Sequence, residues 1–457
     1  MKAVNKHASI IFVFAVVLLL VSIYYVKKAE FTHDVFKPYV YLDNITSWTN
    51  PRLCRWPPDS SKAIQNPETG LFNLAIKPCV RKQEINDHSN TRLERYYELL
   101  EILYPGHLKG GSMTHRARIM EQTLRVDPTE YNYHLYPPLI DVEETVSLVR
   151  QGQKVVRKPI NDPDMSVLVA PRGFCKPDGN ERNRSETVVV IKSCVRCQGD
   201  RQWARATYMQ PHLWGDFRIR FVFVTGMPAI NYTGYIHFEG VSVKYRSHGN
   251  EKQDYENSKR ELFSEANQFD DILIGDFEDH YFSLTQKQIF TFRWISAFCA
   301  NESSLFLFLD HDFAVMPSNL IRLVREFSTE ILPDLSFGIR WQNHRVIRPW
   351  KHSNNRWAIS EDEFPWDYYP PYFGGHAYIK GINVVTDLAI ASAFIHPLRA
   401  EDSHMGIMRY KMRIPTYGVW HFRHRVGSAD GLRYITCVRT GYMINYFNWT
   451  TGKIIGD

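Results

Sequence analysis

Short apolar runs alternate with polar, helix-like segments along the second half of the chain. The run from Thr187 to Ser193 (TVVVIKS) is rich in β-branched residues, which is typical of a strand buried on both faces. Similar patterns predict strands at residues 218–226, 270–277 and 304–310, and helices at residues 199–210, 257–268 and 284–300. Strands that alternate with helices indicate an α/β fold with a mostly parallel central sheet. Ligands of such sheets bind beyond the carboxyl ends of the strands.

The beginning of the chain has a different pattern. An apolar run extends from residue 8 to residue 26 and is flanked by lysines on both sides. It is long enough to cross the roughly 30 Å hydrocarbon core of a bilayer as a helix. A cleaved signal peptide would have a shorter apolar run and a small-residue cleavage site, which the segment lacks. We therefore expect a cytoplasmic tail at residues 1–7, an uncleaved transmembrane signal anchor at residues 8–26, and a lumenal remainder.

Two further features agree with a lumenal location. Five N-x-S/T sequons are candidate glycosylation sites: Asn44, Asn183, Asn231, Asn301 and Asn448. The seven cysteines permit disulfides in an oxidising compartment, and their odd number leaves at least one free or intermolecular. Cys194 and Cys197 have the spacing of half a zinc site, but no second pair follows at the spacing of a zinc finger. A structural role, or a local or longer-range disulfide, is the favoured interpretation.

The composition is that of a globular protein, with 44% hydrophobic and 23% charged residues. The formal net charge of +6 over 457 residues is mild. Such a charge could favour an anionic ligand, but it does not demand nucleic acid. No nucleic-acid-binding motif occurs in the chain, so we expect no nucleic-acid partner.

The short motif that carries most chemistry is FLFLDHDFAV, in which a fully apolar strand runs into Asp310-His311-Asp312. Carboxylate oxygens are hard ligands that suit Mn²⁺ or Mg²⁺. Two aspartates one residue apart can face one ion if the strand turns there. Such an ion could neutralise the charge of a leaving diphosphate. The alternative is an ordinary strand whose polar end meets water.

Several ordered blocks surround this motif. They are R-x-x-x-R-x-T at residues 201–207, D-F-x-D-x-Y-x-x-L-T-x-K at residues 276–287, W-x-x-x-x-C at residues 294–299, Y-P-P-Y at residues 369–372 with Gly375 and Tyr378, and Glu401-Asp402 with Gly406. Each block alone is weak, but their order and spacing together are specific. Between residues 150 and 415 the chain resembles the β1,3-galactosyltransferase and β1,3-N-acetylglucosaminyltransferase family of Golgi type II membrane enzymes.

The resemblance implies a GT-A type nucleotide-sugar-binding domain, which we place at residues 146–457, after a lumenal stem or accessory region at residues 27–145. It implies bound Mn²⁺, with Mg²⁺ as a substitute, and inverting transfer of galactose or an N-acetylhexosamine from a UDP-sugar. The acceptor would be a hydroxyl of a glycan on protein or lipid, joined in β1,3 linkage. The expected location is the Golgi membrane, with one spanning helix and the catalytic domain in the lumen. The sequence does not identify the sugar or the acceptor, and it is compatible with a homodimer or a complex with another transferase.

The matching blocks also imply roles for individual residues. Asp310 and Asp312 are predicted metal ligands. Asp402 is the predicted general base, although a carboxylate that favours a helix N-terminus is the alternative. The predicted donor-binding residues are Arg201, Arg205, Asp276, Asp279, Lys287 and His311. The predicted acceptor- or sugar-binding residues are Gly374, Gly375, Trp357 and Glu401. Each of these residues also has a purely structural alternative. The arginines could form ion pairs and the aspartates could cap a helix. The glycines could form an ordinary turn, and Trp357 could pack within its loop.

The chain also departs from the family pattern. His311 replaces the middle Asp of the usual triplet, and Ser403-His404 replaces the usual Val-Tyr. No histidine follows Cys437, where the family tends to supply a further metal ligand; His421 or His424 could serve instead. These departures support a second hypothesis, a catalytically silent relative that binds glycan or acts as a chaperone for another transferase.

Overall fold

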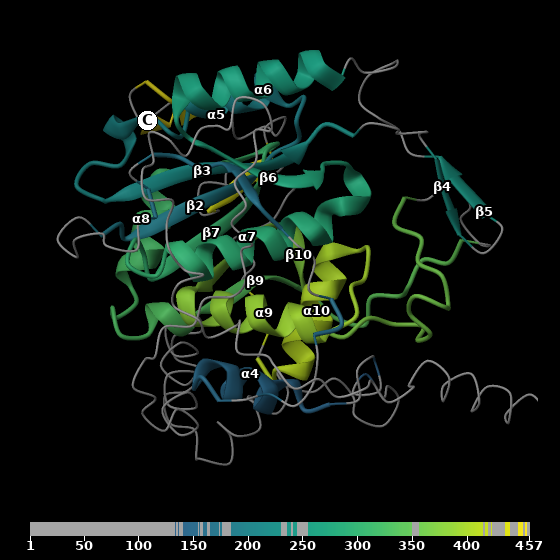
Figure 1. Ribbon diagram of the computed structural model, residues 1–457. Helices are drawn as coiled ribbons and strands as arrows, with labels where there is room; N and C mark the ends of the chain where they lie inside the picture. The colour runs from purple at the N-terminus through teal and green to yellow at the C-terminus, as the bar shows by residue number, and fades with distance from the viewer. Residues whose placement is uncertain are drawn as a thin grey trace, which may run out of the picture.

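The computed structural model describes the chain from Tyr133 onward, mainly residues 140–153, 184–229, 255–349 and 356–414, with shorter stretches before, between and after them. One sheet forms its centre, and helices cover both faces of that sheet (Figure 1). The helices of the described part are all too short or too polar to cross a membrane. The predicted tail, signal anchor and nearly all of the predicted stem lie outside the described residues, so they stay predictions.

The central sheet has eight strands in the order β1-β6-β3-β2-β7-β10-β9-β11. In that order the strands are Val167–Val169, Ile272–Glu278, Ile219–Met227, Thr187–Lys192, Leu305–Asp310, Tyr372–Gly381, Ser336–Trp341 and Tyr417–Gly418. The adjacent strands β6, β3, β2 and β7 are parallel, whereas β10 runs antiparallel to both β7 and β9. The predicted α/β fold with a mostly parallel sheet is therefore confirmed, and the arrangement fits a GT-A type domain.

Three short strand pairs lie outside the main sheet. They are β8 (Phe313–Val315) with β12 (Thr436–Val438), β4 (Tyr235–Phe238) with β5 (Val241–Lys244), and β13 (Phe447–Asn448) with β14 (Lys453–Ile454). Strand β8 follows the Asp-His-Asp motif directly, so its pairing with β12 ties the C-terminal part of the chain to that motif.

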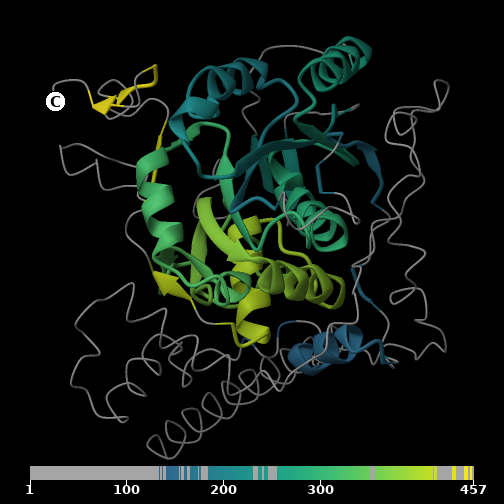
Figure 2. The same cartoon turned by 90° about the vertical axis from the view of Figure 1, so that its left-hand side faces the viewer.

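The described helices are α4 (Val142–Arg150), α5 (Gln198–Ala206), α6 (Tyr255–Phe269), α7 (Leu284–Phe298), α8 (Pro317–Arg325), α9 (Ile382–Phe394) and α10 (Glu401–Lys411). Short 3-10 turns are η5 (Pro211–Leu213), η6 (Tyr281–Ser283) and η7 (Leu332–Asp334). The three predicted helices correspond to α5, α6 and α7. Helix α7 packs on α9, and α4 covers the outer side of α9 (Figures 1 and 2).

Strand β2 is apolar from Val188 to Ile191 because both of its faces are covered. Val188 and Val190 belong to a hydrophobic cluster formed with α4, α7, α9 and α10. Val189 and Ile191 belong to a second cluster formed with α5, α6 and α8. Successive side chains of a strand point to opposite faces, so one unbroken apolar run supplies both clusters.

Parallel pairing brings the ends of the central strands to one edge. Lys192, the last residue of β2, pairs with Asp310, the last residue of β7. On its other side Lys192 pairs with Val224 of β3. Residues that follow β2 and β7 therefore emerge beside each other, beyond the carboxyl edge of the sheet.

Strand β10 extends past this edge because it runs in the opposite direction. Ala377 lies opposite Leu309 of β7, so the first half of β10 continues beyond the end of that strand. The pairing of β10 with β9 shifts register between Phe373 and Tyr378, which indicates a bulge. The two glycines predicted to bind sugar lie within this irregular segment.

Two disulfides occur in the described part. Cys175–Cys299 connects the segment before β2 to the end of α7. Cys194–Cys197 closes the C-x-x-C motif locally, as one of the sequence interpretations expects. Cys437 is buried and free. Of the candidate glycosylation sites, Asn301 lies in the turn between α7 and β7 and Asn448 lies in β13; the other three are outside the described residues.

Gly381 joins β10 to α9 at a point where the backbone leaves no room for a side chain. A Cβ there would lie 2.1 Å from the carbonyl oxygen of Pro333. We expect Gly381→Ala to lower the free energy of unfolding by about 1–3 kcal/mol, because backbone must move to relieve the contact. Gly199→Ala in α5 is the matched control, since nothing lies within 4 Å of that position. Urea unfolding measures both; equal stabilities would contradict the packing described here.

Candidate active site

One buried lysine connects the segments that meet at the carboxyl edge. The Nζ atom of Lys192 lies 2.9 Å from Oδ1 of Asp310 and 2.5 Å from Oε1 of Glu401. It also donates to the carbonyl oxygen of Gly375 at 2.6 Å. An ammonium group has three N–H donors, and here each has an acceptor. Lys192 thereby joins β2 to β7, to β10 and to the start of α10.

The charge of Lys192 is maintained by its partners. Burial alone would lower the pKa of Lys192, but the carboxylates of Asp310 and Glu401 raise it well above its usual value. The side chain therefore stays protonated at any physiological pH. It places a positive charge beside the carboxylate of Glu401, which is only 8% exposed.

The predicted metal ligands flank the turn after β7. The side chain of Asp310 is 36% exposed despite its ion pair with Lys192, and Asp312 is exposed as well. Partial desolvation and then the nearby Asp310 carboxylate raise the pKa of Asp312. Two accessible carboxylates that repel each other form a pair that a divalent cation would stabilise.

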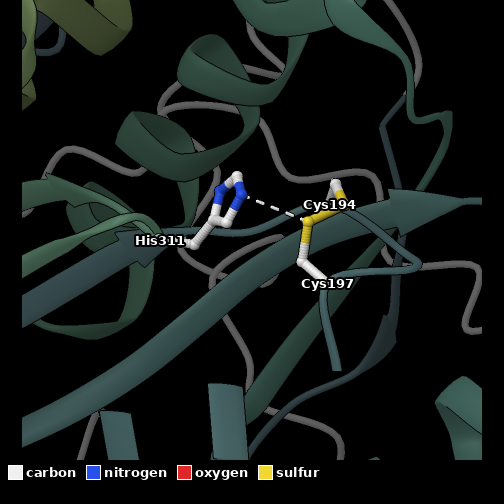
Figure 3. Close-up of side chains that lie close together, drawn as sticks. All are labelled: Cys194, Cys197 and His311. Atoms are coloured by element: carbon white, nitrogen blue, oxygen red, sulfur yellow. Dashed lines mark hydrogen bonds between the residues drawn. A yellow bond between two sulfur atoms is a disulfide. The ribbon is translucent and has the colours of Figure 1, made fainter. Parts of the chain in front are cut away.

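His311, between the two aspartates, turns back toward β2. Its backbone N–H donates to the carbonyl oxygen of Lys192 at 3.1 Å, and its ring Nδ1 lies 3.2 Å from the same oxygen. The other ring nitrogen, Nε2, lies 3.2 Å from Sγ of Cys197 (Figure 3). The side chain that was predicted to bind the donor thus faces the Cys194–Cys197 disulfide.

Asp402, the predicted general base, lies in the first turn of α10. Its Oδ1 accepts a hydrogen bond from the backbone N–H of Ser403 at 2.7 Å. Burial and then the neighbouring Glu401 carboxylate raise the pKa of Asp402 to about 7. A carboxyl group with that pKa can accept or release a proton near neutral pH. A carboxylate in the first turn of a helix also interacts favourably with the helix dipole. Asp402 can therefore stabilise the start of α10 and still act as a base.

Three tyrosines lie near Asp402. Burial raises the pKa values of Tyr281, Tyr369 and Tyr372, and the Asp402 carboxylate adds to each increase. The indole Nε1 of Trp357 donates to the hydroxyl of Tyr281. Trp357 is 54% exposed, so about half of its surface meets solvent.

An open cavity of about 560 Å³ lies next to this aromatic group. Its lining includes His280, Phe282, Gln286 and Arg399. The rings of Phe282 and Tyr281 are 5.6 Å apart, so the cavity adjoins the tyrosine that Trp357 contacts. The cavity thus combines polar side chains with apolar ones such as Ile289 and Leu398, and a sugar ring can use both kinds of contact.

Arg201, a predicted donor-binding residue, has all five guanidinium N–H groups engaged within the protein. Two of them bond the carboxylate of Glu265, at 2.9 and 2.5 Å. The others donate to Ser193 Oγ and to the carbonyl oxygens of Cys194 and Val195. These contacts favour a structural role in which Arg201 fixes the loop between β2 and α5.

Arg205 has a comparable environment. It forms a bidentate pair with Asp271 at 2.7 and 2.8 Å and a third bond to Glu265 at 2.8 Å. Its guanidinium lies 3.9 Å from the centre of the Phe269 ring. Arg205 therefore forms ion pairs within the protein, which is the structural alternative to donor binding.

Asp279 and Lys287 form a buried pair at the same sheet edge. Lys287 Nζ lies 2.8 Å from Oδ1 of Asp279 and donates to the carbonyl oxygen of Ser193 at 2.6 Å. The other oxygen of Asp279 accepts from Thr225 Oγ1 and from the N–H of Gly226. This pair connects β3, β6, α7 and the loop after β2, so it holds these segments together next to the site.

The remaining predicted ligand-binding residues differ in exposure. Asp276 is exposed on β6. A Cβ on Gly374 would lie 3.0 Å from the indole nitrogen of Trp341, and one on Gly375 would lie 3.0 Å from a carboxylate oxygen of Glu401. Both glycines thus permit a side chain to approach the backbone of β10 closely.

The two candidate late ligands, His421 and His424, lie outside the described residues. Phe422, between them, is described, and its carbonyl oxygen lies 2.8 Å from Nε2 of His376. The His376 ring stacks on Phe313, the first residue of β8. Phe422 is therefore linked through His376 to the strand that follows Asp312.

Sequence reasoning missed Lys192 and gave no role to Tyr281. A lysine at the end of an otherwise apolar buried strand is unusual, and this is the signal that could have identified Lys192. Tyr281 is the Y of the D-F-x-D-x-Y block, but that position does not reveal its proximity to Asp402, which depends on packing between distant segments.

One known protein family matches part of the chain. Residues 248–419 match the family described as galactosyltransferase. This region of the chain is similar to the galactosyltransferase family. The matched region includes the Asp310-His311-Asp312 motif and Asp402, and it begins after β2, which carries Lys192.

Curated relatives point to the same family. The chain is 27% identical over 239 residues to beta-1,3-galactosyltransferase brn of Drosophila melanogaster, covering 52% of this chain and 64% of the relative. It is 28% identical over 164 residues to lactosylceramide 1,3-N-acetyl-beta-D-glucosaminyltransferase A of Xenopus laevis, covering 35% and 42%. It is 28% identical over 156 residues to beta-1,3-galactosyltransferase 5 of Mus musculus, covering 33% and 47%. The chain thus spans less than two thirds of the length of these relatives.

The ion pairs of Lys192 give a stability prediction. Lys192→Met leaves Glu401 buried without a counter-charge, so we expect the free energy of unfolding to fall by about 3–5 kcal/mol. Adding Glu401→Gln removes the uncompensated charge and should recover part of that loss. Chemical unfolding of the single and double variants measures the coupling. Additive losses in the double variant would show that the two side chains do not depend on each other.

Proposed function

We propose that this chain is an inverting glycosyltransferase that moves galactose or an N-acetylhexosamine from a UDP-sugar to a glycan hydroxyl in β1,3 linkage. The observation that carries the proposal is Asp402, a carboxyl group with a pKa near 7 beside the Asp310-His311-Asp312 edge. The relatives named above are β1,3-galactosyltransferases and a β-N-acetylglucosaminyltransferase, which supports the same type of transfer.

The carboxylates of Asp310 and Asp312 fit Mn²⁺, and Mg²⁺ as a substitute. Their oxygens are hard donors, both side chains are accessible, and their mutual repulsion would be relieved by a cation. A bound ion would supply charge neutralisation for the leaving diphosphate. Lys192, held 2.9 Å from Asp310, adds a fixed positive charge at the same edge.

Asp402 would act on the acceptor. Its carboxylate takes the proton from the acceptor hydroxyl while that oxygen forms a bond to the anomeric carbon. The bond from the anomeric carbon to the diphosphate oxygen breaks, and its electron pair leaves with UDP. Attack from the face opposite UDP inverts the anomeric configuration. Glu401 is held by Lys192 at 2.5 Å, so it positions the start of α10 and the backbone of Gly375.

The acceptor sugar would stack on the exposed face of Trp357, beside Tyr281. Arg356 supports this face, since its guanidinium lies 4.6 Å from the Tyr281 ring and 5.2 Å from the Trp357 ring. The adjoining 560 Å³ cavity gives space for a further part of the acceptor. The glycan could be carried by a protein or by a lipid.

The proposed location is the Golgi membrane, with the catalytic domain in the lumen. The apolar run at residues 8–26 and the five sequons support it. A homodimer or a complex with another transferase is compatible with this arrangement.

One observation favours the second candidate function, a catalytically silent glycan-binding or chaperone relative. The ammonium group of Lys192 already neutralises part of the Asp310 charge, so it competes with a metal ion for that carboxylate. A silent relative would keep the fold and the aromatic face but would not transfer sugar.

The raised pKa of Asp402 predicts a pH dependence. Transfer should fall as the pH drops below about 7, because a protonated Asp402 cannot accept the hydroxyl proton, and kcat/KM against pH measures this. Asp402→Asn should lower transfer roughly 10²-fold or more. Asp362→Asn, which changes an exposed carboxylate, is the control. Unchanged transfer in the Asp402 variant would refute the role.

The effect of pH on the free energy of unfolding should be opposite to its effect on transfer. A folded-state pKa raised above the unfolded value contributes stability at low pH that is lost as the pH rises through about 7. Asp402→Asn should therefore be less sensitive than the unaltered protein to a pH increase across this range, as thermal unfolding would measure. An identical pH profile would mean that Asp402 is not a desolvated acid.

The metal proposal is tested by calorimetric titration with UDP. UDP should bind in the presence of Mn²⁺ and bind far more weakly without it. Asp312→Asn should weaken the Mn²⁺-dependent binding by at least roughly tenfold, as the loss of even an outer-shell partner can, whereas Asp362→Asn should not. Mn²⁺-dependent UDP binding without any transfer identifies the silent relative, and equal UDP binding with and without Mn²⁺ contradicts the metal role.

A further inference from the structure

The fold supplies the third ligand that the C-x-x-C motif lacks in the sequence. Cys194 and Cys197 follow β2, and His311 follows β7, 114 residues further along the chain from Cys197. Because Lys192 and Asp310 pair at the ends of these two strands, the residues after them emerge side by side. The sulfur atoms and a ring nitrogen of His311 all lie within 4.8 Å of one another (Figure 3).

The imidazole of His311 is oriented as a metal ligand would be. Nδ1 lies 3.2 Å from the carbonyl oxygen of Lys192, an acceptor to which it can donate a hydrogen. Nε2 lies 3.2 Å from Sγ of Cys197 and can offer its lone pair to a cation when Nδ1 carries the hydrogen. Histidines that bind metals usually donate their other ring N–H to a backbone carbonyl or a carboxylate in this way.

The loop that carries the cysteines is held in place by contacts other than the disulfide. Arg201 donates to the carbonyl oxygens of Cys194 and Val195 at 2.6 and 3.2 Å. Lys287 donates to the carbonyl oxygen of Ser193 at 2.6 Å. The side chains of Arg201 and Lys287 are themselves buried and paired with carboxylates. Opening the disulfide would thus leave two thiols in a position already fixed by the fold.

We propose that Cys194, Cys197 and His311 form a redox-controlled site for a thiophilic divalent cation of the zinc class. A dithiol reductant transfers two electrons and two protons to the disulfide and becomes a disulfide itself, which yields two cysteine thiols. The cation then displaces both thiol protons and binds two thiolates and Nε2 of His311. A carboxylate oxygen of Asp200, 3.8 Å from Nε2, is close enough to help complete a tetrahedral set. The disulfide form is closed to metal because both sulfurs are bonded to each other.

This site differs in chemistry from the Asp310 and Asp312 carboxylates, although His311 lies between them. Thiolate and imidazole ligands select zinc-class ions, whereas carboxylates suit Mn²⁺ or Mg²⁺. The proposal concerns binding and not transfer, so it stands or falls independently of the proposed function.

Cobalt titration of the full chain tests the site. The protein is reduced with a dithiol, freed of reductant without air, and titrated with Co²⁺. Reduced protein should bind one Co²⁺ per chain and develop a thiolate-to-cobalt charge-transfer absorption, which Zn²⁺ then abolishes by displacement. Untreated protein should show no such absorption. Absence of the absorption in the reduced protein would overturn the proposal.

Matched variants locate the ligands. Cys437→Ser removes the buried free thiol and should leave the absorption intact. The double variant Cys194→Ser/Cys197→Ser should abolish it, and His311→Gln should weaken Co²⁺ binding and shift the spectrum. Absorption that persists in the double variant would place the metal elsewhere and refute the site.

Differential alkylation provides a readout that does not depend on any variant folding. In reduced, otherwise unaltered protein, Zn²⁺ should protect Cys194 and Cys197 from alkylation, as mass spectrometry of the peptides would measure. Equal labelling of both cysteines with and without Zn²⁺ would contradict the proposal.

Discussion

The ion pairs of Lys192 are the interaction on which the arrangement of the site depends. A carboxylate as buried as Glu401 is costly unless a counter-charge accompanies it, and the ammonium group of Lys192 is that counter-charge. Because the same group also contacts Asp310 and the backbone of Gly375, it fixes four segments relative to one another. Asp402 follows Glu401 directly, so its position beyond the sheet edge is set by a lysine on another strand.

The charge balance at this edge supports the proposal of a cation there. Lys192 is accompanied by the carboxylates of Asp310, Asp312, Glu401 and Asp402, so acidic groups outnumber the basic one among these residues. Desolvation raises the pKa values of Asp312 and Asp402, and the neighbouring carboxylates of Asp310 and Glu401 raise them further. Added positive charge would lower both pKa values and would make the carboxylate form of Asp402 available at lower pH.

The apolar runs of the sequence were sufficient to predict the central strands and the helices between them, because burial on both faces demands uninterrupted hydrophobicity. The motif positions of Asp310, Asp312 and Asp402 were also predictable, and the structure places all three near one edge. The residues that bond to the predicted site residues were not predictable from the sequence. The arginines at 201 and 205 bond Glu265 and Asp271, residues about 60 positions away that no local pattern connects to them. The antiparallel direction of β10 likewise depends on tertiary pairing.

The contacts of Lys192 also have a consequence for biogenesis. Its partners Gly375 and Glu401 lie 183 and 209 residues further along the chain. A ribosome-bound or truncated polypeptide that ends before them would contain an apolar strand terminated by an ammonium group with no carboxylate from α10 to receive it. Closing such distant contacts is slow, and it can follow only after most of the intervening chain has been synthesised. The sheet edge and the site are therefore completed together, late in folding. A chain shortened before α10 would lack the site rather than retain a weakened form of it.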